Sequence, residues 1–165
     1  MYLQYLKRIN YRESKEPAFR IFNVLNILKP TTMDTPLNFW AVLVAALSTF
    51  LIGGLWYSPA VFGKAWMREN GFTEESLKGR NNGKIFGLAF FLAIIAAINL
   101  AMFMGPENKP EMGALWGFLA GFGWVATFVG THYLFERRSF KLFLINAGYS
   151  IVALTIMGVI LAVWK

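Results

Sequence analysis

The sequence lacks cysteine altogether and contains a single histidine. Without cysteine, the chain can form no disulfide bond, no thiolate nucleophile and no cysteine metal ligand. One histidine and one aspartate, Asp34, leave few groups for a metal site or a catalytic triad. Every acidic residue also lies outside the apolar blocks described below, so a catalytic pair of carboxylates is not supported. We therefore expect no enzymatic activity, no metal site and no cofactor.

Charged residues are also scarce, at 15% of the 165 residues, whereas an average soluble domain has about 25%. Apolar residues make up 56%, and the charges gather between long apolar blocks. A net charge of +7 is compatible with nucleic-acid binding, but here the basic residues sit in short loops, where they orient a membrane protein. We therefore expect the lipid bilayer, and no nucleic acid, as the main partner.

Four apolar blocks are long enough to cross a bilayer, whose core of about 30 Å needs roughly 20 helical residues. None of them contains Lys, Arg, Asp or Glu, and they cover residues 37–57, 85–104, 112–135 and 142–164. The connections between them are short, which favours antiparallel neighbours. The sequence therefore predicts an all-α membrane protein, an antiparallel up-down bundle of four transmembrane helices.

The first loop begins with an unusual mixture of aromatic residues, proline and lysine. Ser58–Pro59 can cap and start a short helix. On that helix Phe62 and Trp66 share one side, while Lys64 and Arg68 share another. This amphipathic pattern predicts a short helix in the membrane interface. A solvated loop is the alternative, because an acidic residue falls near the apolar side.

Residues 1–32 form a basic N-terminal extension, distinct from a transmembrane domain at 33–165. Within the extension, apolar residues at 18–28 gather on one helical side, which predicts a second surface helix. A different interpretation is that Met33 is the natural start and that the upstream residues are not native. A transit peptide is disfavoured because acidic residues interrupt the segment.

Basic residues predict the orientation of the spans. The segments outside the spans hold, in chain order, six, five, one, three and one Lys or Arg. Both termini of a four-span protein share a side, so each side carries eight. Counted from Met33, the terminal side carries only two. The positive-inside rule then places the loops at 58–84 and 136–141 in the cytoplasm of a multi-pass protein, in the plasma membrane, or the inner membrane of a bacterium.

The third block carries a row of glycines with regular spacing. Gly113, Gly117 and Gly121 recur every four residues, which gives two overlapping G-x-x-x-G steps. At 100° per residue, Thr127 and Thr131 join the same side. Small residues let membrane helices approach closely, so this side is predicted to pack against another helix. The alternative is that glycine is merely tolerated in a transmembrane helix.

Polar side chains within the blocks are the remaining candidates for a site. His132 lies at the edge of the glycine side, one turn before Glu136, and is interpreted as a hydrogen-bonded or ion-paired interface residue; a proton-handling site is the alternative. Asn99, Asn146 and Ser150 are uncharged, and the last two are neighbours at i,i+4. We interpret them as interhelical hydrogen-bonding groups, with a small-solute site as the second interpretation.

Two stretches resemble a known family. Residues 38–67, with the pattern GGLWYSP…FGKAW, resemble the opening of the small membrane proteins called domain of unknown function 1761, and residues 131–161 are similar to its closing half. The resemblance covers nearly everything after Met33. It implies an integral membrane protein, and it implies no activity and no catalytic or binding residue.

These observations favour a non-enzymatic membrane protein whose function is helix association, either as a homo-oligomer or as an accessory subunit of a larger membrane complex. The alternative is a small-solute transporter or channel subunit. Small multidrug transporters of similar length carry a membrane-embedded glutamate, which the block at 37–57 lacks. This absence disfavours proton-coupled export but leaves a passive pore open.

Overall fold

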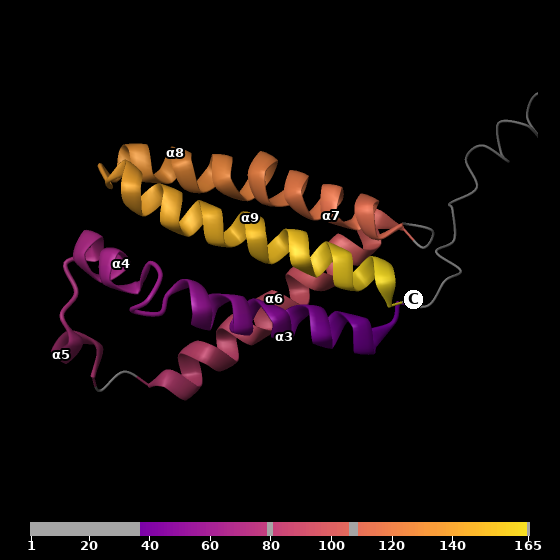
Figure 1. The fold of residues 1–165 in the computed structure, drawn as a ribbon, viewed down its shortest axis with the longest axis horizontal. Helices are drawn as coiled ribbons and strands as arrows, with labels where there is room; N and C mark the ends of the chain where they lie inside the picture. The colour runs from indigo at the N-terminus through magenta and orange to yellow at the C-terminus, as the bar shows by residue number, and fades with distance from the viewer. Residues whose placement is uncertain (1–36, 79–80, 106–108, 165) are drawn as a thin grey trace, which may run out of the picture. The chain divides into compact units, whose positions relative to one another are not determined.

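The computed structural model describes residues 37–78, 81–105 and 109–164, and every regular element within these ranges is a helix (Figure 1). The predictions for residues 1–32, including the surface helix at 18–28 and the alternative start at Met33, lie outside the described residues. Within the described ranges, four helices are long and apolar enough to cross a membrane, which confirms the four predicted blocks as helices. Together they indicate a multi-pass membrane protein.

The long helices are α3 (Phe39–Trp56), α6 (Asn82–Met104), a composite third helix from Pro110 to Phe135, and α9 (Phe140–Val163). Three of the long helices begin two or three residues before the predicted blocks, whereas α3 begins two residues after its block. Their starting points follow from local capping. The side chains of Asn38, Asn81 and Ser139 each accept a backbone N–H of the first turn, and Pro110 occupies the first turn of the third helix.

The packed core centres on α9, which lies between α3 and the third helix (Figure 1). Ala45 of α3 and Ala97 of α6 are completely buried, and they cluster with Leu100 and with Met157 of α9. Small alanine side chains let α3 and α6 approach closely where they cross. The first half of α6 is exposed from Asn82 to Ala89, so this helix is held mainly by its second half.

The first loop contains two short helices, α4 (Gly63–Asn70) and α5 (Glu74–Leu77). The prediction that Ser58–Pro59 starts the helix was wrong, because residues 58–62 fold back on α3. There the Phe62 N–H donates to the carbonyl of Trp56, and the Gly63 N–H donates to that of Ser58. A Cβ atom at Gly63 would overlap the Tyr57 carbonyl oxygen, so this reversal requires glycine.

The third helix is interrupted at its centre by a π-helical segment. It consists of α7 (Pro110–Leu119), the π-helix η1 (Ala120–Ala126) and α8 (Thr127–Phe135). A π-helix closes hydrogen bonds from i to i+5 and therefore changes which residues share a side.

This change corrects the predicted glycine side beyond Gly121. Thr127, Thr131 and His132 are exposed, whereas Ala126 is buried. Gly130 faces α9, since a Cβ atom added there would lie 3.1 Å from the Phe143 ring. The α9-facing row thus takes one step of five residues inside η1, and uniform 100° spacing could not predict it.

Candidate functional site

The three predicted glycines line a close contact between the third helix and α9. A Cβ atom at Gly113 would overlap the carbonyl oxygen of Gly158, and one at Gly117 would overlap that of Leu154. A Cβ atom at Gly121 would lie 2.7 Å from the Cα atom of Ile151. The partner numbers fall as the glycine numbers rise, so the two helices run in opposite directions. We call this contact the glycine seam; it lies within a single chain.

A polar cluster joins three elements at the end of the molecule that carries the first and third loops. The Asn146 carboxamide oxygen accepts a hydrogen bond of 2.9 Å from the Tyr57 hydroxyl, and its Nδ2 donates one of 2.8 Å to the Tyr133 hydroxyl. Tyr57 follows α3, Tyr133 is in α8 and Asn146 is in α9. Asn146 thus satisfies two half-buried phenol hydroxyls, which would be costly to leave unpaired.

Three more side chains next to this cluster donate to backbone carbonyls. The Ser150 hydroxyl donates to Asn146, the Tyr149 hydroxyl to Thr49, and the Trp56 indole to Ile145. The last two bonds tie α3 to α9. No local sequence signal predicts these two bonds, because they pair residues 100 and 89 positions apart.

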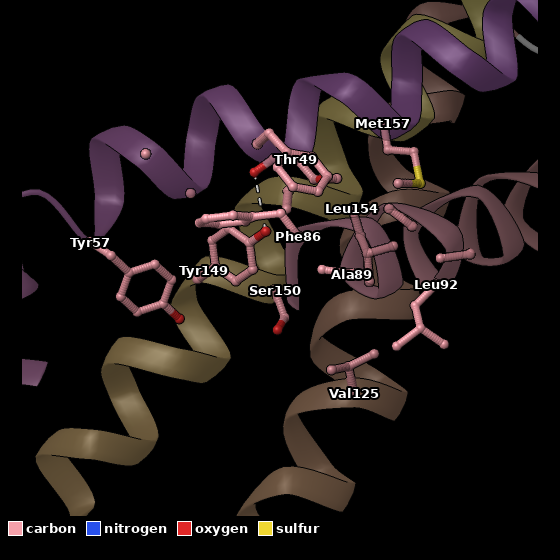
Figure 2. Close-up of a pocket in the computed structure, with 16 residues that line it drawn as sticks. Thr49, Tyr57, Phe86, Ala89, Leu92, Val125, Tyr149, Ser150, Leu154 and Met157 are labelled. Atoms are coloured by element: carbon pink, nitrogen blue, oxygen red, sulfur yellow. Dashed lines mark hydrogen bonds between the residues drawn. The ribbon is translucent and has the colours of Figure 1, made fainter. Parts of the chain in front are cut away.

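A cavity of about 750 Å³ lies between α3, α6, η1 and α9 (Figure 2). Small residues create the space, among them Gly53 and Gly54 of α3 and Ala89 and Ala93 of α6. Its lining includes no charged residue and is mostly apolar. Pockets of about 300–1,000 Å³ with mostly apolar walls and a few polar groups are typical of small-molecule sites.

Glu69 of α4 connects the first loop to the start of α9. Its carboxylate accepts a hydrogen bond of 2.6 Å from the Ser139 hydroxyl, and it lies 4.0 Å from the Lys141 ammonium. Only 19% of its side chain is exposed. In the sequence, the acidic residue Glu69 favoured a solvated loop over a helix. In the structure, Glu69 instead holds α4 against Ser139 and Lys141 at the start of α9.

Comparison with known families identifies the relatives of this chain. The model of the family described as "Protein of unknown function (DUF1761)" matches residues 40–162. The chain belongs to this family. No curated protein and no solved structure matches it. The family resemblance of the two sequence stretches is thereby confirmed.

In this DUF1761 protein the other predicted polar residues lie apart from the cluster around Asn146. His132 and Glu136 are both exposed, and the Glu136 backbone N–H donates to the His132 carbonyl at 2.9 Å. No side-chain hydrogen bond or ion pair joins them in the part of the chain that the structure describes. Glu136 instead pairs with Arg138 at 3.4 Å, where both side chains are about half exposed. Among residues 37–78, 81–105 and 109–164, no group of three His, Cys, Asp or Glu could hold a metal ion.

Asn99 is exposed on α6 and does not join Asn146 and Ser150. Its Nδ2 donates to the carbonyl of Ile95, one turn earlier in the same helix, at 2.8 Å. No hydrogen bond within the described ranges reaches its Oδ1 atom. This residue therefore presents an amide oxygen where a membrane protein meets lipid.

Proposed function

We propose that this protein is a non-enzymatic integral membrane protein that self-associates through α6. The observation that carries the proposal is Asn99, whose amide oxygen has no hydrogen-bond partner among the described residues and which lies on a helix face directed away from the core. A polar group in hydrocarbon is stabilised when a neighbouring helix supplies its partner. In a two-fold symmetric dimer, the same amide of a second copy is that partner.

The residues around Asn99 support this surface. Exposed positions on α6 alternate in steps of three and four along one stripe: Ile85, Leu88, Leu92, Ile95, Asn99 and Met102. This spacing is the a/d pattern of a left-handed helix pair, in which one asparagine sets register and oligomer size. We call it the α6 stripe. The glycine seam is already occupied inside the chain, so self-association must use another surface, and the α6 stripe is one that carries an exposed asparagine.

Replacing Asn99 with leucine should weaken the dimer about three- to tenfold, because an interhelical hydrogen bond of about 0.6–1.4 kcal/mol is lost. The measurement is energy transfer between labelled copies of the full chain, diluted in lipid bilayers. Thr131→Val is the matched control, since it also removes an exposed polar atom from a span but lies on α8. Equal dissociation constants for wild type and Asn99→Leu would reject the amide pair.

Cysteine cross-linking locates the surface independently, because the chain has no native cysteine. Leu88→Cys lies on the α6 stripe, and Gly87→Cys lies beside it on an exposed side of the same helix. Paired Cα atoms must come within about 7 Å to form a disulfide. Efficient disulfide formation in Leu88→Cys, but not in Gly87→Cys, supports a dimer formed through the α6 stripe. A chain that stays monomeric, or that is held by a protein of different sequence, contradicts self-association and favours an accessory subunit.

We further infer that the four helices form an antiparallel up-down bundle in the membrane, with the loops at 58–84 and 136–141 in the cytoplasm and α4 and α5 in the interface. The hydrogen bond between Ser139 and Glu69 supports a common side for these loops. They carry five and three basic residues, against one in the second loop. Such an excess marks cytoplasmic loops.

The orientation predicts where the C-terminus lies. A reporter that is active only outside the cytoplasm, such as alkaline phosphatase, should be active when it is fused after Lys165. A fluorescent protein that requires the cytoplasm should stay dark at the same position. The reverse pattern would invert the topology, and fusions within residues 136–141 provide the opposite control.

A transporter or channel subunit is the second candidate function, and the cavity beside α6 is the observation that favours it. Its mostly apolar lining supports an apolar cargo rather than a path for water or ions.

A further inference from the structure

The cavity between α3, α6, η1 and α9 is large enough for a molecule, and no side chain of the described residues fills it. We infer that it binds an uncharged, long-chain amphiphile that carries a hydroxyl group and enters from the bilayer. This inference concerns a ligand site and does not depend on self-association through α6.

The space results from glycine and alanine residues on the facing helices. Gly53 and Gly54 line the cavity from α3, and Ala89 and Ala93 line it from α6. A Cβ atom added at Gly54 would meet no atom within 4 Å. The volume of about 750 Å³ falls in the range of about 300–1,000 Å³ that small-molecule sites occupy.

The lining is polar at one end only. In Figure 2 the hydroxyl-bearing residues Tyr57, Tyr149 and Ser150 lie toward one end, and Leu92 and Met157 lie toward the other. Tyr57 directly follows the last residue of α3, so the polar end is the one nearer the loops and the membrane surface. A single-chain amphiphile has the same polarity along its length, with its polar group at the interface.

The hydrogen bonds of the lining decide which polar group fits. The hydroxyl protons of Tyr57 and Ser150 are both donated to Asn146, and that of Tyr149 is donated to the Thr49 carbonyl. Each hydroxyl oxygen still has lone pairs that can accept a hydrogen bond. A ligand at this end must therefore donate, as an alcohol does, whereas an ether can only accept.

The absence of charged side chains from the lining argues against amphiphiles with a charged headgroup. The lining contains no Lys, Arg, Asp or Glu. A carboxylate, a phosphate or an ammonium group placed there would lack a counter-charge in a low-dielectric site, which is costly. The chemistry of the site therefore fits a neutral alcohol rather than a fatty acid anion or a lipophilic cation.

The test uses the full chain in phosphatidylcholine nanodiscs and hexadecanol with a photoreactive diazirine in its alkyl chain. We expect light-dependent labelling of α3, α6 and α9 residues that line the cavity. Unlabelled 1-hexadecanol should compete, whereas its methyl ether should compete at least about fivefold less well, because it cannot donate a hydrogen bond. Equal competition by the ether, or labelling spread evenly over all lipid-facing helices, overturns the inference.

Two variants check the position of the ligand. Gly54→Leu should abolish specific labelling, because its side chain occupies the cavity. Gly87→Leu is the matched control, since a Cβ atom there also meets nothing but Gly87 does not line the cavity. Ser150→Ala should weaken binding of the alcohol about fivefold and leave binding of the ether unchanged. Unaltered labelling in Gly54→Leu, in a protein with normal size and stability, places the ligand elsewhere and rejects the site.

Discussion

Replacement of Gly117 by leucine is expected to separate the third helix from α9. A Cβ atom at this position would overlap the carbonyl oxygen of Leu154 and lie 2.7 Å from its carbonyl carbon. These are backbone atoms of a regular helix, so no side-chain rotation can make room. Overpacking commonly costs about 1–3 kcal/mol, and a rigid backbone neighbour places this case at about 3 kcal/mol or more.

The measurement is the size distribution and the thermal stability of the full chain in mild detergent. Gly123→Leu is the control, because Gly123 lies in the same span but an added Cβ atom there meets nothing within 4 Å. We expect the control to behave as wild type and Gly117→Leu to aggregate or unfold at a much lower temperature. Similar stability of both variants would mean that the glycine seam is not a tight contact.

The spans could be predicted from sequence because hydropathy is a local property. A run of about 20 apolar residues has few alternatives to a membrane-spanning helix, whatever its neighbours are. The same local reasoning groups Gly113, Gly117 and Gly121 on one side, and in the structure a Cβ atom added at any of them would meet α9. These residues fall within or just after regular α-helix. It failed at Thr127 and Thr131 because η1 inserts a step of five residues into the α9-facing row, and reasoning at a uniform 100° per residue does not include such a step.

The polar residues show a similar limit. Asn99 and Asn146 look alike in the sequence, since each is a single amide within an apolar block. In the structure Asn99 is exposed on α6, whereas Asn146 forms hydrogen bonds with Tyr57 and Tyr133. The difference arises from long-range contacts, which place tyrosines from two other elements beside α9. The cavity could not be predicted from the sequence either, because it depends on how α6 crosses α3.

Replacement of Asn146 by leucine is expected to destabilise the folded chain by about 2 kcal/mol, although the new side chain is of similar size. Removing the amide leaves the Tyr57 and Tyr133 hydroxyls without their partner. An unsatisfied buried polar group costs about 1–3 kcal/mol. Membrane hydrogen bonds average only about 0.6 kcal/mol, and Tyr57, Tyr133 and Asn146 are all half-buried. Each of the two unpaired hydroxyls is therefore expected to cost near the lower end of that range, which gives about 2 kcal/mol in total.

Reversible unfolding of the monomer in mixed detergent micelles measures this free energy, and a combined variant separates two explanations. If the loss comes from unpaired hydroxyls, then adding Tyr57→Phe and Tyr133→Phe to Asn146→Leu should recover most of the stability, because all three polar partners are then gone. If the loss comes instead from poor packing of leucine, the combined variant should be no more stable than Asn146→Leu alone. Asn99→Leu provides the comparison for an exposed asparagine in another span, and it should leave monomer unfolding nearly unchanged, since its amide bonds only its own helix.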